Sequence, residues 1–392
     1  MAAAGKGRSI ALLVAAVTLA MSLWFVSAAA LPELVAEAGI GRGRAAALSA
    51  AVQLGFVVGA LALAAHGTAD RFDPRRVLAV SALLAAGANL ALVAAPVGGA
   101  AQVGLRALTG AALAGVYPVG MKIAVGWGAR DRGLLVALIV AAVTLGSATP
   151  YLLAFAGGAD WRVAVVVASG LACLGAGLGL AAGLGPGHAR ARGFDPGALR
   201  LAWTDRRLRL AYAGYFGHMW ELYAFWGWIA AAATAAFAER LAAPADAGRL
   251  LAFAAIGLGA LSAAPAGWLA DRIGKARVAR GALLASGCSG LAAALAFHGP
   301  AWLFVAVVCA WGLSVVADSA QFSALVADAA PPERAGSLMT LQTAIGFLLT
   351  VPVVQAIPAV SAALGWPATL ALMAVGPAAG AEAMRRLIRL GG

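Results

Sequence analysis

Long uninterrupted runs of apolar residues follow one another along this chain, and short polar gaps separate them. A helix needs about 20 apolar residues to cross the hydrocarbon core of a bilayer, and each run has roughly that length. In lipid a helix also satisfies its own backbone hydrogen bonds, so the sequence predicts an all-α membrane protein. Twelve transmembrane helices are expected, over 9–31, 45–66, 76–96, 101–126, 133–155, 162–185, 209–237, 249–270, 277–297, 300–327, 336–357 and 365–385.

The composition excludes a water-soluble fold. Of the 392 residues 63% are hydrophobic and 11% are charged, whereas about a quarter of the residues in an average soluble domain are charged. The net charge of +12 does not indicate nucleic-acid binding, because the basic residues lie between the apolar runs and not along one face. The expected partner is therefore the lipid bilayer, and no nucleic acid.

Residues that hold metals or perform catalysis are scarce and scattered. Cys173, Cys288 and Cys309 lie inside apolar runs without CxxC spacing, and the four histidines are not clustered. The sequence therefore predicts no metal site, no cofactor and no catalytic residue, which argues against a membrane enzyme. The polar gaps are also too short to hold the sensing domain of a receptor.

The basic residues predict the orientation of the chain. If both termini and the even-numbered gaps lie on one side, that side receives all but six of the 28 Lys and Arg residues. By the positive-inside rule this side is the cytoplasm, so we expect a multi-pass protein of the bacterial inner membrane with both termini cytoplasmic. The six exceptions are Arg42, Arg44, Arg106, Arg162, Arg240 and Arg249.

The longest polar gap divides six predicted helices from six. It contains several Arg and Gly residues and two Pro residues, a composition typical of a linker. We expect an N-terminal six-helix bundle over 1–185, a cytoplasmic linker over 186–208 and a C-terminal six-helix bundle over 209–392.

The two halves carry the same motif. The gap after the second run contains Ala-Asp70-Arg71 with trailing cations, and Ala-Asp271-Arg272 recurs 201 residues later in the gap after the eighth. An internal repeat of six helices is typical of secondary transporters, whose substrate site lies near the membrane midplane between the repeats.

At these residues the sequence resembles the major facilitator superfamily, whose cytoplasmic motif between helices 2 and 3 has the form GxxxDRxGRR. The second copy matches it at Gly267, Asp271, Arg272, Gly274 and Lys275. In the first copy the glycine, Gly67, stands one position late, and Asp73 replaces the second glycine. The resemblance covers the whole chain and implies two pseudo-symmetric six-helix bundles that alternate access to a central site.

A nearer likeness concerns the predicted helix 101–126. Its Tyr117-Pro118 and Met121-Lys122 pairs are similar to uptake members of the superfamily for small anions, including the cyanate and nitrate branches. The arginine pair in helices 2 and 8 and the glycine-rich signature of the nitrate group are missing.

The repeated motif predicts a conformational latch. Its glycines are expected to let helices approach closely, its acids to lie near a helix N-terminus, and its arginines to pair with acids. The alternative is that the cations only fix the topology. The predicted latch residues are Gly67, Asp70, Arg71, Arg75, Arg76, Gly267, Asp271 and Arg272.

Ionisable residues inside apolar runs predict where protons move, because a charge at membrane depth is costly. His218 and Glu221 lie three residues apart on one helical face, and such a pair accepts and releases a proton. Asp318, within the predicted helix 300–327, is a further proton-coupling candidate. The alternatives are a His–Glu pair that only satisfies itself and, for Asp318, an interhelical hydrogen bond. For Arg106 the resemblance implies proton coupling, because the arginine of the family's helix 4 has that association.

Aromatic and polar side chains predict the substrate site. The resemblance implies that helices 1 and 7 line the cavity, where aromatic walls stack on a planar substrate or enclose a cation. Lys122 is expected to meet an anion. The alternatives are packing for the aromatic residues, snorkelling for Lys122 and helix–helix hydrogen bonds for the glutamines. The predicted substrate contacts are Trp24, Tyr117, Lys122, Trp220, Tyr223, Trp226, Gln321 and Gln342.

Together these features predict a secondary active transporter that moves a small organic or inorganic anion with protons, as a symporter. The alternative is proton-coupled export of drugs or other hydrophobic or cationic compounds. Two buried acids and an aromatic lining favour export, whereas the weak match of 146–150 to the helix 5 motif of drug/proton antiporters disfavours it. The expected partners are a small molecule, protons and lipid, and the repeat makes a monomer sufficient.

Overall fold

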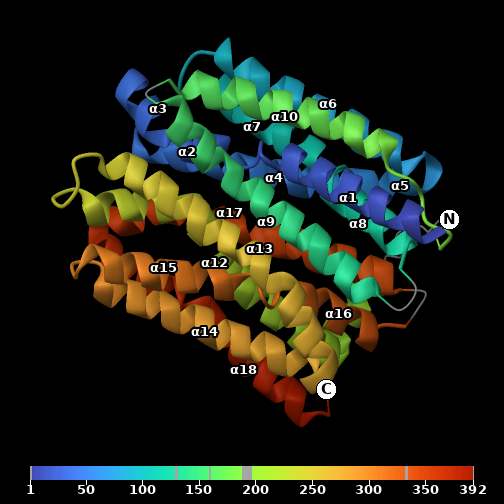
Figure 1. The fold of residues 1–392 in the computed structure, drawn as a ribbon. Helices are drawn as coiled ribbons and strands as arrows, with labels where there is room; N and C mark the ends of the chain where they lie inside the picture. The colour runs from blue at the N-terminus through green and yellow to red at the C-terminus, as the bar shows by residue number, and fades with distance from the viewer. Residues whose placement is uncertain (1, 129–130, 159, 188–196, 332–333, 392) are drawn as a thin grey trace. The chain divides into compact units, whose positions relative to one another are not determined.

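The computed structural model describes residues 2–128, 131–158, 160–187, 197–331 and 334–391, with the backbone alone at 2–4, 69–70 and 197–199. Every regular element in this part of the chain is a helix, which confirms the predicted all-α class (Figure 1). Two predictions fall outside it, namely the side chain of Asp70 and residues 188–196 of the expected linker.

Each of the twelve predicted ranges is helical for most of its length. Nine helices among the described residues are long and apolar enough to cross a membrane. One of these covers Ala335–Arg389, 55 residues, which at 1.5 Å per residue is about 80 Å and more than twice the hydrocarbon thickness. Gly365, with φ +80 and ψ 166, interrupts it, so this stretch accounts for two of the predicted spans.

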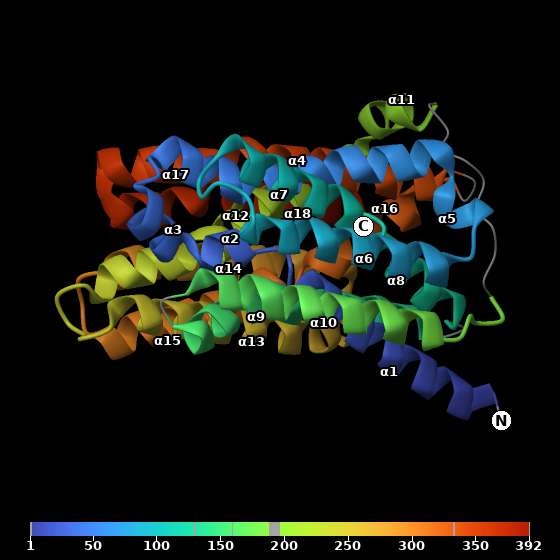
Figure 2. The same ribbon diagram turned by 90° about the horizontal axis from the view of Figure 1, so that it is seen from above.

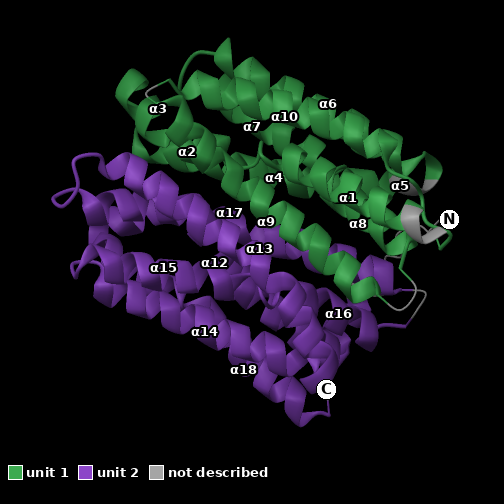
Figure 3. Ribbon diagram, viewed as in Figure 1, with its two compact units in different colours: residues 1–191 green, residues 192–392 purple. Residues whose placement is uncertain are grey.

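The chain divides into two compact units, residues 1–191 and residues 192–392, coloured separately in Figure 3. The border falls within the gap that we expected to be a linker, and a short helix, α11, forms in the second part of that gap. Unit 1 contains α1 (Ala2–Met21), α2 (Val26–Ala29), α3 (Leu31–Ala38), α4 (Arg42–His66), α5 (Thr68–Arg71), α6 (Pro74–Leu90), η1 (Ala91–Val93), α7 (Ala100–Leu113), α8 (Tyr117–Gly126), α9 (Arg132–Gly157) and α10 (Trp161–Ala181).

Unit 2 repeats this order of long helices. Its elements are α11 (Gly197–Thr204), α12 (Arg206–Phe237), α13 (Pro244–Ile273), α14 (Lys275–Ala296), α15 (Ala301–Val315), α16 (Ser319–Ala329), α17 (Ala335–Met373) and α18 (Val375–Arg389). In unit 1, α4 packs along α7 and α10 lies between α1 and α6 (Figures 1 and 2). In unit 2, α12 packs against α13, α17 and α18, and α13 packs along α15.

Small residues bring the helices of each unit together. A Cβ atom on Gly110 of α7 would overlap the backbone of Val52 in α4, and one on Gly312 of α15 would overlap the backbone of Ala255 in α13. The two contacts stand at equivalent places in the repeat. They allow backbone-to-backbone approach in an environment where lipid removes the hydrophobic driving force between helices.

Three helices that we expected to be continuous are broken. The expected helix 9–31 is interrupted between α1 and α2, the expected helix 101–126 between α7 and α8, and the expected helix 300–327 between α15 and α16. Pro118, in the first turn of α8, explains the second break, because proline removes a backbone donor and clashes with the carbonyl four residues earlier. The other two breaks lie beside buried ionisable side chains.

Candidate functional site

Unit 2 buries a carboxylate in the middle of α12. Glu221 is 1% exposed, and each of its carboxylate oxygens accepts one hydrogen bond. The Ser286 hydroxyl of α14 donates to Oε2 over 2.8 Å, and the Trp311 indole N–H of α15 donates to Oε1 over 2.7 Å. Three helices therefore converge on this acid, and each of its oxygens has a donor inside the bundle.

His218, one turn before Glu221 on α12, reaches the break between α15 and α16. Its Nδ1 lies 2.8 Å from Oδ1 of Asp318, and both side chains are 2% exposed. Its Nε2 lies 3.1 Å from the hydroxyl of Ser319. Asp318 is the last residue before α16 and Ser319 is the first residue of that helix, so the imidazole lies against both residues at the break.

We call these six residues the acid–imidazole cluster: Glu221, Ser286, Trp311, His218, Asp318 and Ser319. Two carboxylates and one imidazole lie inside the bundle, and no Lys or Arg of the described residues forms an ion pair with them. Because burying an unbalanced charge is costly, the protonation of this cluster is tied to its structure. The serine hydroxyls both donate and accept, so they accommodate either protonation state.

Unit 1 buries a cation instead. Arg106 on α7 is fully buried, and its Nη1 donates to the carbonyl of Leu23 over 3.0 Å and to Oδ1 of Asn89 over 3.1 Å. Its Nη2 donates to the carbonyl of Trp24. These carbonyls follow the end of α1, where a helix carries partial negative charge. The guanidinium therefore explains why the expected first helix is broken at this point.

The predicted proton-coupling residues thus divide between the units. Glu221, His218 and Asp318 belong to one cluster in unit 2, whereas Arg106 lies in unit 1 with backbone carbonyls and an amide as its acceptors. Sequence reasoning missed Ser286, Trp311, Ser319 and Asn89. Trp311 stands two helical turns before Asp318, a spacing that places both on one side of a helix and was a readable signal.

Within their own units the motif glycines do not make the close helix contacts that we expect of them. Gly67 caps α4 with φ +66, a left-handed conformation that favours glycine. A Cβ atom on Gly267 would meet no atom within 4 Å. Neither glycine brings helices together. Other glycines make such contacts, among them Gly110, which meets the backbone of Val52. Gly110 lies in the interior of the bundle, whereas the motif glycines lie at or near helix ends.

Asp73, which replaces the second motif glycine, has a clear local role. Its carboxylate accepts a hydrogen bond from the Arg75 backbone N–H over 2.9 Å and so caps α6. Its Oδ2 also lies 2.7 Å from Nη2 of Arg75. The Arg75 guanidinium holds the pKa of the Asp73 carboxyl below its usual range.

The other cations of the predicted latch stay at the surface. Arg71 and Arg76 are exposed, as is Asp271. Arg272 lies over the Trp268 ring with its guanidinium carbon 3.3 Å from the ring centroid, which is a cation–π contact. In the second copy Lys275 pairs with Asp328 over 2.5 Å. An acid–cation pair therefore occurs at each motif copy. In unit 1 it lies within the loop, and in unit 2 it joins the start of α14 to α16.

The predicted aromatic contacts pack against other rings of their own units. In unit 1 the Trp24 ring lies 5.1 Å from the Phe56 ring. In unit 2 the Tyr223 ring lies 5.5 Å from the Trp226 ring and 5.0 Å from the Phe347 ring. Trp220 instead donates its indole N–H to the carbonyl of Leu372 over 3.3 Å.

The remaining predicted contacts are partly or fully buried. Tyr117 begins α8 and Lys122 lies one turn later, both half-buried. Gln321 and Gln342 are buried in unit 2, where the amide of Gln342 donates to the carbonyl of Phe322 over 3.4 Å. The described residues contain no group of three or more His, Cys, Asp or Glu side chains suited to a metal ion.

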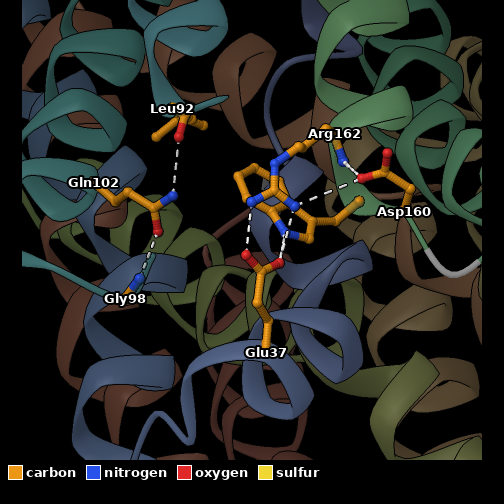
Figure 4. Close-up of polar contacts among 7 residues, drawn as sticks. Glu37, Leu92, Gly98, Gln102, Asp160 and Arg162 are labelled. Atoms are coloured by element: carbon orange, nitrogen blue, oxygen red, sulfur yellow. Dashed lines mark hydrogen bonds and ion pairs between the residues drawn. The ribbon is translucent and has the colours of Figure 1, made fainter. Parts of the chain in front are cut away.

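A charged contact fastens α3 to the start of α10. The Glu37 carboxylate faces the Arg162 guanidinium (Figure 4), with Oε1 2.6 Å from Nη2 and Oε2 2.9 Å from Nη1. The Trp161 indole N–H also donates to Oε2 over 2.7 Å. The hydrogen bonds from Arg162 and then Trp161 lower the pKa of Glu37 from 4.5 to about 2.

We expect this contact to loosen in acid. Because the pKa of Glu37 is lowered on folding, its contribution is complete above pH 4.5 and is lost as the pH falls towards 2. The contact is partly exposed, so the effect on overall stability is small. Protease cleavage within residues 30–42 will therefore rise between pH 4.5 and pH 3 with an acid-active protease. A Glu37→Gln variant will be cleaved equally at both values, whereas Glu239→Gln, an exposed control, will follow the wild type.

The fold and the site together define a helical membrane protein of two six-helix units with buried ionisable groups. A sequence profile of the Major Facilitator Superfamily matches residues 12–348. The chain belongs to this superfamily. It is therefore a multi-pass secondary transporter that moves a small molecule by alternating access, and it is not an enzyme.

Solved structures agree with this assignment of the fold. The xylose transporter XylE from E. coli, in a partially occluded inward-open conformation, is 14% identical, with a TM-score of 0.74 and coverage of 98% of both chains. A mutant of the nucleoside transporter NupG is 12% identical, with a TM-score of 0.71 and coverage of 97% of this chain and 99% of that one. No curated protein sequence matches the chain at a significant level. The likeness to cyanate and nitrate transporters stays a prediction.

Proposed function

We propose that this transporter moves a small organic or inorganic anion together with protons, and that the protons bind in unit 2. The observation that carries the proposal is the acid–imidazole cluster. Two carboxylates that are 1% and 2% exposed have no Lys or Arg partner among the described residues. Charging both carboxylates at once in such a place is costly. The cluster therefore binds protons in one state of the transport cycle and releases them in another.

The choice of an anion is supported by a cation of unit 1 other than Arg106. Lys122 is half-buried on α8, which follows the break after α7. We propose Trp24, Tyr117 and Lys122 as substrate contacts in unit 1. In unit 2 we propose Trp220, Tyr223, Trp226, Gln321 and Gln342.

The second candidate is export of hydrophobic or cationic compounds. The aromatic group of Tyr223, Trp226 and Phe347 supports it, with ring centroids 5.0 and 5.5 Å apart, because such a group encloses a cation or a flat ring. The buried acids are compatible with both candidates, so the choice depends on the compound that moves.

We further propose that the protein lies in the bacterial inner membrane as a monomer with both termini cytoplasmic. The excess of Lys and Arg in the even-numbered gaps supports this orientation. The latch also remains part of the proposal. It is supported by the acid–cation pair at each motif copy, Asp73–Arg75 in unit 1 and Lys275–Asp328 in unit 2.

The proposal is tested in proteoliposomes that hold a pH-sensitive dye. Addition of small carboxylates or inorganic anions is expected to change the internal pH with the wild type, and the change is expected to be lost in Asp318→Asn. Glu239→Gln, an exposed acid outside the cluster and the motif pairs, is the control. If organic cations or lipophilic compounds alone move protons, export replaces anion symport. If no compound moves protons although substrate accumulates, the coupling role of the cluster is wrong.

A further inference from the structure

A small cavity lies inside unit 1, bounded by α2, α3, α4, η1, α7 and α10. Its polar wall consists of Ser27, Gln102, Arg106 and Trp161, and aliphatic side chains complete it. The free space in it is small, with room for about one small particle. Of the predicted substrate contacts and proton-coupling residues, only Arg106 lines this cavity.

The charge on Arg106 is only partly balanced. Its acceptors are two backbone carbonyls and one amide oxygen, all of them neutral, and no carboxylate of the described residues pairs with it. The end of α1 supplies about half a negative charge. The Nε–H of Arg106 is buried without an acceptor. An unmet donor on a buried cation costs more than an unmet neutral donor, so this wall of the cavity favours an anion.

The acid that contacts the wall residue Trp161 is already engaged. Glu37 pairs with Arg162 and accepts from the Trp161 indole N–H, while Trp161 also forms part of the cavity wall. Gln102 is held at both ends, because its amide donates to the Leu92 carbonyl over 3.0 Å and its oxygen accepts from the Gly98 N–H over 2.9 Å (Figure 4). These contacts fix the wall in place, and none of them balances the rest of the Arg106 charge.

We propose that this cavity binds one small monovalent anion, of the size of chloride, bromide or formate, through Arg106. A halide or a carboxylate oxygen accepts the free Nε–H and balances the charge. The aliphatic wall disfavours strongly hydrated divalent anions such as sulfate, because one guanidinium cannot offset their loss of water. This anion is a resident of unit 1, so the inference does not rest on the proposed transport of an anion.

The test is the thermal stability of the full-length protein in detergent, at constant ionic strength and without any gradient. Sodium chloride, bromide and formate are each expected to raise the melting temperature in a saturable manner relative to sodium gluconate. Sodium sulfate is expected to give no saturable rise, only the gradual increase that an excluded salt causes. Equal melting temperatures in all five salts, or a saturable rise with sulfate of the same size, would overturn the proposal.

Variants that fill the cavity test whether the anion binds there or elsewhere on the protein. Ala30→Val adds two methyl groups at the wall and keeps Arg106 with its carbonyl partners, and Val165→Leu fills the same space from α10. Either folded variant is expected to lose the halide-dependent rise, and to lose the broadening of the ³⁵Cl NMR line that the wild type causes. Ala100→Val, exposed on α7, is expected to keep both. A rise that persists in the filled variants places the anion elsewhere and refutes the site. Anion transport that fails while this binding persists would refute only the proposed function.

Discussion

Glu221→Gln is expected to lower substrate-driven proton flux at least about 100-fold, a typical size for the loss of a proton-transfer group. The amide has the shape of the carboxyl but binds no proton in the physiological range. Proton movement measured with an internal pH dye will therefore be close to that of empty liposomes, whereas the wild type will acidify or alkalinise the interior with its substrate.

The substitution is expected to leave the protein folded. In the wild type Trp311 donates to one oxygen of Glu221 and Ser286 donates to the other. A glutamine oxygen keeps the contact with Trp311, and the Ser286 hydroxyl turns to accept from the glutamine amide, because a hydroxyl is both donor and acceptor. A melting temperature within a few degrees of the wild type checks this point.

Exchange of labelled for unlabelled substrate separates coupling from binding. It requires no net proton movement, so Glu221→Gln is expected to retain it while net uptake driven by a pH gradient is lost. Glu239→Gln, an exposed change just beyond α12, is the matched control and should behave as the wild type. Proton flux that survives in Glu221→Gln would assign the proton to His218 and Asp318 alone and would make Glu221 a structural acid.

The long helices were predictable because each depends on a local run of apolar residues. The breaks were harder to predict. Pro118 marks the interruption between α7 and α8 in the sequence itself, but the end of α1 depends on Arg106, which lies about 80 residues further along and reaches the carbonyls of Leu23 and Trp24. No local pattern contains that contact.

The candidate site shows the same division. Glu221, His218 and Asp318 stand out in the sequence because they are ionisable residues inside apolar runs. Their partners depend on which helices surround α12. The spacing of His218 and Glu221 predicted one shared pair, yet His218 contacts Asp318 and Ser319, while Glu221 contacts Ser286 and Trp311. Tertiary packing decided the pairing, and the helical period alone did not.

Gly110→Val is the second change with a large expected effect, on folding rather than transport. A Cβ atom at Gly110 overlaps the backbone of Val52 in α4, and backbone cannot rotate away as a side chain does. The helices α4 and α7 must therefore separate, which loses their packing along several turns. We expect a loss of at least about 3 kcal/mol, the upper part of the usual range for overpacking, seen as aggregation in fluorescence-detected size-exclusion chromatography or as a much lower melting temperature.

Gly104→Val separates packing from helix propensity. It lies on the same helix, α7, and a Cβ atom there meets nothing within 4 Å, so both variants share the intrinsic preference of valine but only one meets a neighbour. Gly104→Val is therefore expected to melt close to the wild type. If Gly110→Val melts there as well, α4 and α7 do not approach at this residue.

The same comparison can be made in unit 2, where Gly312 of α15 meets the backbone of Ala255 and Gly257 of α13 meets nothing within 4 Å. Gly312→Val is expected to be as damaging as Gly110→Val, and Gly257→Val to be tolerated. Equal losses at the two close contacts would show that both repeats depend on the same kind of packing, although one buries a cation and the other buries acids. The repeat would then preserve how the helices pack, while the buried ionisable groups have diverged between the units.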